Sequence, residues 1–250
     1  MQSMGGHLSE MARRCGPLAQ GRWPWLVVAL IFGIHGLVES AGGVQQVAQW
    51  YLALGLRREA FLSGSLWQVL TYAWLHGSWA HVLINALCLL VLGGRVVHIL
   101  GERGFLKTLA AGILGGALGH LLLAGETGNA SPLVGISGAC VALLLVITTL
   151  SPESRMFPLP VSGRSLGLGI LTAEWLLALA DPRLGVPGFA QIGQALVAHG
   201  QGAWFAIGHA CHVGGGMAGY LCGIWILRPS TTLARLRQQR QRREAKQGGR

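Results

Sequence analysis

The chain has 250 residues, of which 52% are hydrophobic and only 11% are charged, whereas a soluble domain carries roughly 25% charged residues. This composition excludes an ordinary soluble domain and, with 39 glycines and a mean hydropathy of +0.50, favours a helical membrane protein. The net charge of +10 does not indicate nucleic-acid binding, because eight of the nineteen Lys and Arg residues lie in 228–250, directly after an apolar stretch. Such a tail is typical of a cytoplasmic anchor beside anionic lipid headgroups.

Six apolar stretches are candidates for membrane-spanning helices, since about 20 residues cross a hydrocarbon core about 30 Å thick. In chain order they are residues 24–43, 79–98, 105–124, 137–150, 165–180 and 203–227. The stretch 44–62 is too polar to span and suits a loop or helix lying in the membrane interface. The sequence therefore predicts an all-α, polytopic membrane protein with six transmembrane helices.

The basic residues fall mostly on one side of such a bundle. With both termini in the cytoplasm, sixteen of the nineteen Lys and Arg residues are cytoplasmic, which follows the positive-inside rule. We therefore expect a multi-pass protein of the bacterial inner (cytoplasmic) membrane with both termini cytoplasmic and membrane lipids as partners. The expected organisation is a cytoplasmic segment 1–22, a membrane domain 23–228 and a basic cytoplasmic tail 229–250.

The fourth candidate helix is too short to cross a bilayer alone. Residues 137–150 number 14, which is about 21 Å of helix. The preceding segment, 129–136, must then enter the membrane from outside as irregular backbone, which is tolerated only inside protein or beside a wet cavity. This arrangement places Ser137 at a helix amino terminus within the membrane.

Polar residues at membrane depth are costly and are therefore candidates for function. Counted from the cytoplasmic helix ends at about 1.5 Å per residue, Asn85, Ser137 and His212 lie about 20, 21 and 24 Å up, in one layer. A serine becomes a nucleophile when a base such as histidine lies within hydrogen-bond reach. Ser137 and His212 are therefore the predicted catalytic pair. No Asp or Glu accompanies His212 in the sequence, which favours a dyad over a triad, and Glu174, the only acidic residue in a span, is a proton-relay group or a structural carboxyl.

The donors of an oxyanion hole are also recognisable. His81 and Asn85 are spaced i, i+4 and project from one face of the second helix. The backbone N–H of Ser137 lies at a helix amino terminus, where free donors and the helix dipole favour negative charge. We expect these three groups to bind the oxyanion of an acyl-transfer reaction.

Glycines support the predicted site. Gly215, Gly219 and Gly223 repeat every four residues on the sixth helix, and such a stripe lets another helix approach closely. Gly135 and Gly138 flank the serine, where we expect them to leave room for a peptide backbone.

The alternatives are a metal site and a transporter. His209, Cys211 and His212 suggest a metal, but consecutive helical positions diverge and no HExxH motif occurs, so we predict neither a metal nor a cofactor. The depth count favours His212 over His209 as the base, which leaves His209 as a hydrogen-bonding or water-facing group near the cavity mouth. A transporter would show inverted repeats and paired charges at mid-depth, and the sequence shows neither.

Taken in order, the motifs resemble those of bacterial rhomboid proteases. The matching runs are Trp67-Gln-Val-Leu-Thr71, His76-x4-His81-x3-Asn85, Leu92-Gly-Gly94, Gly135-Ile-Ser-Gly138 and His212-x2-Gly215-x3-Gly219. The resemblance implies six helices around a water-filled cavity open to the outside, with the same dyad and oxyanion hole. It also implies that 44–62 is the family's first loop and that 189–203 belongs to a mobile cap. The implied activity is hydrolysis of single-pass membrane protein substrates near their outer end, with no nucleic acid involved.

Two positions depart from the family pattern. Its Trp-Arg pair reads Trp67-Gln68 here, and the glutamate that usually follows Gly-Gly is absent, with Val97 and His98 in that region. Both positions are structural in the family, so the departures bear on subfamily and stability more than on chemistry.

Two narrower identities remain open alongside a general rhomboid protease. The run His76-Gly-Ser-Trp79-Ala-His81 resembles rhombosortases, which are thought to process proteins with a carboxy-terminal Gly-Gly sorting tail. A catalytically inactive relative that binds membrane helices is the other alternative, and the presence of both dyad residues and both oxyanion side chains disfavours it.

Overall fold

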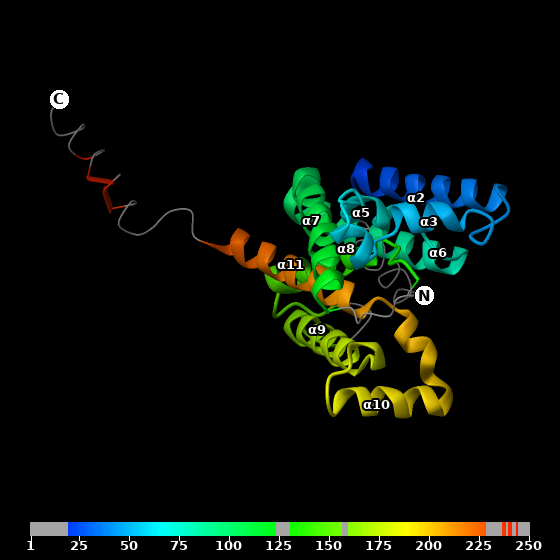
Figure 1. Cartoon of the computed structure of the whole chain (residues 1–250). Coiled ribbons are helices and arrows are strands. Elements are labelled where there is room, and N and C mark those ends of the chain that lie inside the picture. The colour runs from blue at the N-terminus through cyan, green and yellow to red at the C-terminus, as the bar shows by residue number, and fades with distance from the viewer. Residues whose placement is uncertain are drawn as a thin grey trace, which may run out of the picture.

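The computed structural model describes residues 20–123, 131–156 and 160–228, and positions 237, 238, 240, 241 and 244 of the tail. This part of the chain is mainly helical. Its only β-structure is a pair of isolated β-bridges, Leu56–Leu133 and Arg155–Ser162. The predicted all-α fold is thereby confirmed (Figure 1). The expected segment 1–22 and tail 229–250 lie largely outside the described residues.

Helical segments of very different lengths follow one another along the described chain. In order they are α2 (Arg22–Ser40), α3 (Ala48–Leu54), α4 (Arg58–Leu62), α5 (Gln68–Thr71), η2 (Tyr72–Trp74), α6 (Trp79–Cys88), the π-helical η3 (Leu89–Gly93), α7 (Gly94–Leu123), α8 (Ser137–Leu150), α9 (Gly163–Ala180), η4 (Pro182–Leu184), α10 (Phe189–Leu196), η5 (Val197–Gln201), η6 (Gly202–Ala206) and α11 (His209–Leu227).

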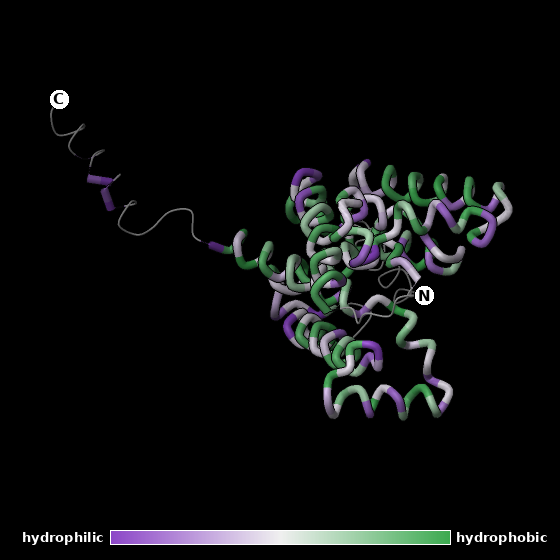
Figure 2. Tube along the Cα trace, in the orientation of Figure 1, coloured by the Kyte–Doolittle hydropathy of each residue, from purple (hydrophilic) through white to green (hydrophobic). Residues whose placement is uncertain are grey.

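The long apolar helices correspond to the predicted spans. By length and composition, three helical segments of the described chain can cross a membrane: Arg22–Ser40, Trp79–Leu123 and His209–Leu227. Trp79–Leu123 has 45 residues and is broken at Gly101 (φ 71°, ψ 174°), so it contains both the second and the third predicted span. In Figure 2, hydrophobic residues predominate along these helices, and hydrophilic residues gather at helix ends and in connections.

One predicted boundary is wrong. The sixth span was expected to begin at residue 203, but α11 begins at His209, because Gly202–Ala206 forms a separate 3₁₀ turn and Ile207 is extended (φ −81°, ψ 137°). Side chains from elsewhere hold the carbonyl groups of this turn. His209 Nε2 lies 2.9 Å from Trp204 O, and Arg183 Nη2 donates to Phe205 O at 2.6 Å.

The centre of the bundle is α8, which packs against α7 and α11. The glycine stripe makes this packing close, as predicted: a Cβ at Gly215 would meet Gly138 of α8, and one at Gly219 would meet Ala142. A neighbouring glycine, Gly214, faces Gly119 of α7 in the same way. The helices α8 and α11 therefore touch along their backbones, which fixes the relative position of the side chains at their amino ends.

The predicted interfacial segment 44–62 forms the short helices α3 and α4. The start of α5 caps α3: Trp67 Nε1 donates to Ala53 O at 2.9 Å, and the Gln68 side-chain amide donates to Ala53 O at 3.2 Å. Thr71 Oγ1 donates to Leu54 O at 2.5 Å. Gln68 is 1% exposed and also accepts the Arg57 N–H at 3.0 Å, so this departure from the family pattern has a clear structural role.

Candidate active site

The segment before Ser137 enters the bundle as irregular backbone, as the short fourth helix predicted. It is held by the neighbouring connection: Leu56 and Leu133 exchange two backbone hydrogen bonds of 3.0 Å, and Gly135 N donates to Tyr72 O at 2.9 Å. Because its backbone groups are paired with protein, the segment can lie inside an apolar bundle. Ser137 is then the first residue of α8. Residues 129 and 130 of the predicted segment lie outside the described residues.

Ser137 and His212 meet at the amino ends of α8 and α11. His212 Nε2 lies 2.8 Å from Ser137 Oγ, which is a hydrogen-bond distance. The Ser137 side chain is half-buried and the His212 side chain is 12% exposed. The two residues that the depth count paired are therefore in contact, and His212 rather than His209 is the histidine at the serine.

A carboxylate accompanies this histidine, contrary to the sequence-based prediction. His212 Nδ1 lies 3.0 Å from Glu174 Oε1 of α9, and His209 Nδ1 lies 2.6 Å from Glu174 Oε2. The prediction failed because Glu174 is 38 residues from His212 and belongs to no motif. The signal that could have found it was its position as the only acidic residue in a predicted span.

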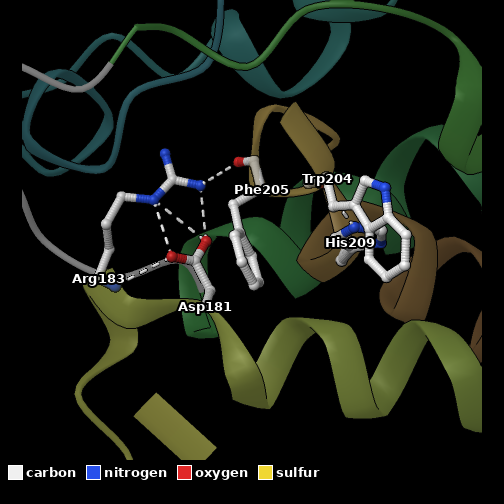
Figure 3. Close-up of polar contacts among 5 residues, drawn as sticks. All are labelled: Asp181, Arg183, Trp204, Phe205 and His209. Carbon is white, nitrogen blue, oxygen red and sulfur yellow. Dashed lines mark hydrogen bonds and ion pairs between the residues drawn. The ribbon is translucent and has the colours of Figure 1, made fainter. Parts of the chain in front are cut away.

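His209 is buried in this cluster, so of the two roles expected for it, hydrogen-bonding or water-facing, the structure favours the first. Its side chain is 7% exposed, and its second ring nitrogen contacts Trp204 O. Figure 3 shows His209 beside Trp204 and, next to them, the ion pair of Asp181 and Arg183 beside Phe205. The hydrogen-bonding role expected for His209 is therefore observed.

His81 and Asn85 of α6 lie beside Gly135, in the segment that precedes Ser137. Gly135 has φ +110°, and a Cβ there would lie 2.6 Å from His81 Cε1 and 3.6 Å from Asn85 Nδ2. Asn85 is 2% exposed, and its Nδ2 has no hydrogen-bond partner among the described residues. Cys140 Sγ lies 3.9 Å from Asn85 Oδ1 as a weak donor, which leaves the amide nitrogen as the group available to an incoming acceptor.

A second buried histidine supports His81. The rings of His76 and His81 are in edge-on contact at 4.9 Å, and His76 is 1% exposed. Burial, and secondarily the proximity of His81, lowers the pKa of His76 to about 4. His76 is therefore neutral at pH 7 and adds no positive charge beside His81.

The glycines that flank the serine are packed closely against neighbouring side chains. The space at Gly135 is filled by His81. A Cβ at Gly138 would lie 2.7 Å from Cys211 Sγ of α11, so Gly138 serves the contact between helices. Both glycines therefore allow close packing around the serine, and the room that they leave for a peptide backbone stays a prediction.

Three side chains could also hold a metal ion. The ligand atoms of Glu174, His209 and His212 all lie within 4.8 Å of one another. The sequence argument against a metal considered His209, Cys211 and His212 and did not include Glu174, which supplies an acidic ligand. The observed separations of 2.6 and 3.0 Å are those of hydrogen bonds that carry protons, and a divalent cation would have to displace those protons.

A family model described as the Rhomboid domain matches residues 63–229, more than half of the chain. The chain belongs to the rhomboid family. Similar proteins include two from Arabidopsis thaliana, "RHOMBOID-like protein 12, mitochondrial" and "RHOMBOID-like protein 7". The chain is 27% identical to the first over 155 residues, covering 55% of this chain and 46% of the relative. It is 32% identical to the second over 115 residues, which cover 42% of this chain and 36% of the relative. The chain therefore spans less than half the length of these relatives.

The rhomboid domain contains every side chain of the site, and with the apolar helices it makes this chain a multi-pass membrane protein. In this rhomboid, the part of α7 that follows Gly-Gly contacts the start of α2. Glu102, further along α7, accepts the Arg22 N–H at 3.0 Å, and His98 Nδ1 lies 3.0 Å from Gln20 Oε1. These contacts join α7 to the start of α2.

Proposed function

We propose that this rhomboid is an intramembrane serine endopeptidase that cleaves single-pass membrane protein substrates near the outer face of the membrane. The observation that carries the proposal is the 2.8 Å contact between Ser137 Oγ and His212 Nε2 at the amino end of a helix inside an apolar bundle. Family membership supports proteolysis, but it does not by itself distinguish an active protease from an inactive relative.

In the proposed reaction, Ser137 Oγ attacks the scissile carbonyl and its proton passes to His212 Nε2. The oxyanion accepts hydrogen bonds from Asn85 Nδ2, the His81 ring and the Ser137 N–H. His212 then gives its proton to the leaving amine, and the acyl-enzyme forms. A water molecule, deprotonated by His212, attacks the acyl carbon, and His212 returns that proton to Ser137 Oγ as the bond between Oγ and the acyl group breaks. The proposed reaction uses four residues, Ser137, His212, His81 and Asn85, and needs no cofactor.

The position of the site supports cleavage at the outer end of the membrane domain, residues 23–228. His212 lies in the first turn of α11, which runs to Leu227 and is followed by the basic tail. His212 and Leu227, the last residue before Arg228 and the basic tail in sequence, are thus at opposite ends of α11. If the tail is cytoplasmic, as the positive-inside rule requires, the site opens toward the outside, and both termini lie in the cytoplasm of a bacterial cell.

The test uses the purified protein in detergent, a single-pass substrate and a fluorophosphonate probe. Ser137→Ala should abolish both cleavage and labelling, because the nucleophile is removed with little change in volume. Ser40→Ala is the matched control, since Ser40 is exposed on α2 and donates only to Leu37 O. Cleavage by the Ser137 variant would refute the assignment, and an unreactive wild-type protein would indicate the inactive relative.

The rhombosortase alternative concerns the substrate and not the chemistry. The motif from His76 to His81 is the feature that favours it. Adding a second substrate that carries a carboxy-terminal Gly-Gly sorting tail separates the two identities: preference for that substrate over a general single-pass substrate would assign the narrower one.

A further inference from the structure

Glu174 and His209 extend the proposed pair into a chain of hydrogen bonds. The chain runs from Trp204 O through His209, Glu174 and His212 to Ser137, with successive separations of 2.9, 2.6, 3.0 and 2.8 Å. The three titratable side chains are 7%, 17% and 12% exposed. These contacts come from four elements, η6, α8, α9 and α11, so the arrangement depends on the fold and not on a local motif.

The partners of His209 determine its protonation. Its Nε2 faces the Trp204 carbonyl, which can only accept a hydrogen bond, and its Nδ1 faces a carboxyl oxygen. Satisfying both contacts takes a proton on Nε2 and a second proton between Nδ1 and Glu174 Oε2. Imidazole is a stronger base than a carboxylate in water, and this proton therefore belongs to His209. His209 is then an imidazolium paired with an ionised Glu174.

The same reasoning fixes the tautomer of His212. Its Nδ1 faces the ionised Glu174 and donates to it, so Nε2 carries the lone pair that accepts the Ser137 hydroxyl proton. This is the tautomer that a general base at Ser137 needs. A neutral His212 with its proton on Nε2 would present a donor to the serine and a lone pair to the carboxylate.

We propose that Glu174 is a positioning residue that holds His212 in its reactive tautomer and stabilises the imidazolium formed when His212 takes the serine proton. His209 is a resident cation that keeps Glu174 ionised. The inference rests on the proposed function, and it replaces a dyad with a carboxylate-supported pair. When the proton moves from Ser137 Oγ to His212 Nε2, the bond Oγ–H breaks, Nε2–H forms, and the new positive charge lies beside Glu174.

Other charged or titratable groups face the cluster and bear on its pH dependence. His81 of α6 faces His212, and a proton on His81 would oppose the imidazolium. Cys211 of α11 is fully buried near Glu174 and uncharged when its thiol is protonated. Asp181 and Arg183, just after the end of α9, form an ion pair with each other, so their charges cancel. Glu174 is therefore the negative group that contacts His212 in the described part of the chain.

The kinetic test compares Glu174→Gln with wild type over a range of pH. The amide keeps the shape but removes the charge and permits the wrong tautomer, so kcat should fall by about 10²- to 10⁴-fold. KM should stay within about twofold, because uniform substrate binding is unchanged. The acid limb of the pH–rate profile should move to lower pH, since the imidazolium form of His212 loses its partner. Glu174→Asp should restore part of kcat.

Glu153→Gln is the matched control, because Glu153 is 77% exposed and pairs with Arg164 outside the site. A kcat for Glu174→Gln within about twofold of wild type at every pH, with Ser137→Ala inactive, would overturn this inference and leave the proposed function standing. An inactive wild-type protein that does not label would overturn the proposed function instead. The two failures are therefore distinguishable.

A spectroscopic test applies even if the Glu174 variants fail to fold. In wild-type protein with ¹⁵N-labelled histidine at pH 7, one ring should show both nitrogens protonated, and His209→Gln should remove that signal. A second ring should show a proton on Nδ1 alone, and His212→Gln should remove it. A His209 with a single protonated nitrogen, or a His212 protonated on Nε2, would contradict the proposed chain.

Discussion

Gly215→Ala should separate the two helices that carry the serine and the histidine. A Cβ at Gly215 would lie 2.6 Å from the carbonyl carbon of Gly138 and 2.9 Å from its Cα, whereas carbon atoms pack at about 3.5–4.0 Å. The atoms in contact belong to backbone and cannot rotate away, so α11 must move from α8 by about 1 Å. His212 lies three residues before Gly215, and its contact with Ser137 Oγ would stretch from 2.8 Å beyond hydrogen-bond range.

A misplacement of about 1 Å costs about 10²-fold in rate, and overpacking costs about 1–3 kcal/mol in the free energy of unfolding. We therefore expect cleavage and fluorophosphonate labelling by Gly215→Ala to fall about 10²-fold, with a lower midpoint of thermal unfolding. Gly36→Ala on α2 is the matched control, because nothing lies within 4 Å of a Cβ at that position. Wild-type rate and stability for Gly215→Ala would refute the argument that backbone contact sets the geometry of the pair.

Removing a proposed oxyanion donor, by His81→Ala or Asn85→Ala, should lower turnover by about 10²- to 10³-fold without abolishing it; wild-type turnover in both variants would leave these residues a purely structural role. His212→Ala should eliminate cleavage and labelling. His209→Ala should retain a substantial part of both, because the Ser137–His212 contact and the Glu174–His212 contact remain and only the cation beside Glu174 is lost; the reverse result would make His209 the base. A reporter fused after the last residue should behave as cytoplasmic and one placed between α9 and α10 as external, and an external carboxy terminus would overturn the proposed orientation.

The sequence predicted the long helices and the meeting of Ser137 with His212 because both depend on simple lengths. A helix rises about 1.5 Å per residue and the bilayer has a fixed thickness, so residues counted from one membrane face can be compared in height. The 14-residue helix α8 was predicted with its observed bounds, and its short length required the preceding backbone to be irregular. The four-residue spacing of the glycines on α11 places them on one face and predicted the close approach of another helix, which the structure shows to be α8.

The sequence could not predict contacts that depend on how helices are rotated about their axes. Glu174 is one of several positions on α9, and only the packed bundle shows that this position faces α11. Likewise, the sequence did not predict that Gly138 faces Cys211, a contact that follows from the rotation of α8. The start of α11 was misplaced because the apolar residues 203–207 are suitable for a helix, and the tertiary contacts of Arg183 and His209 hold that segment in another conformation.

The two sides of Ser137 differ in a way that matches their proposed tasks. On the side of α9 and α11, the polar groups of Glu174 and both histidines are paired, which fixes where each proton lies before the reaction begins. On the side of α6, Asn85 Nδ2 has no partner among the described residues. A donor that is buried and unpaired in the resting site gains its hydrogen bond when an oxyanion forms beside it, so that contact favours the transition state over the ground state. The hydrogen bonds of Glu174 with the two histidines thus set the position of each proton before the reaction. Asn85 Nδ2 stabilises the negative charge with a hydrogen bond that forms only during the reaction.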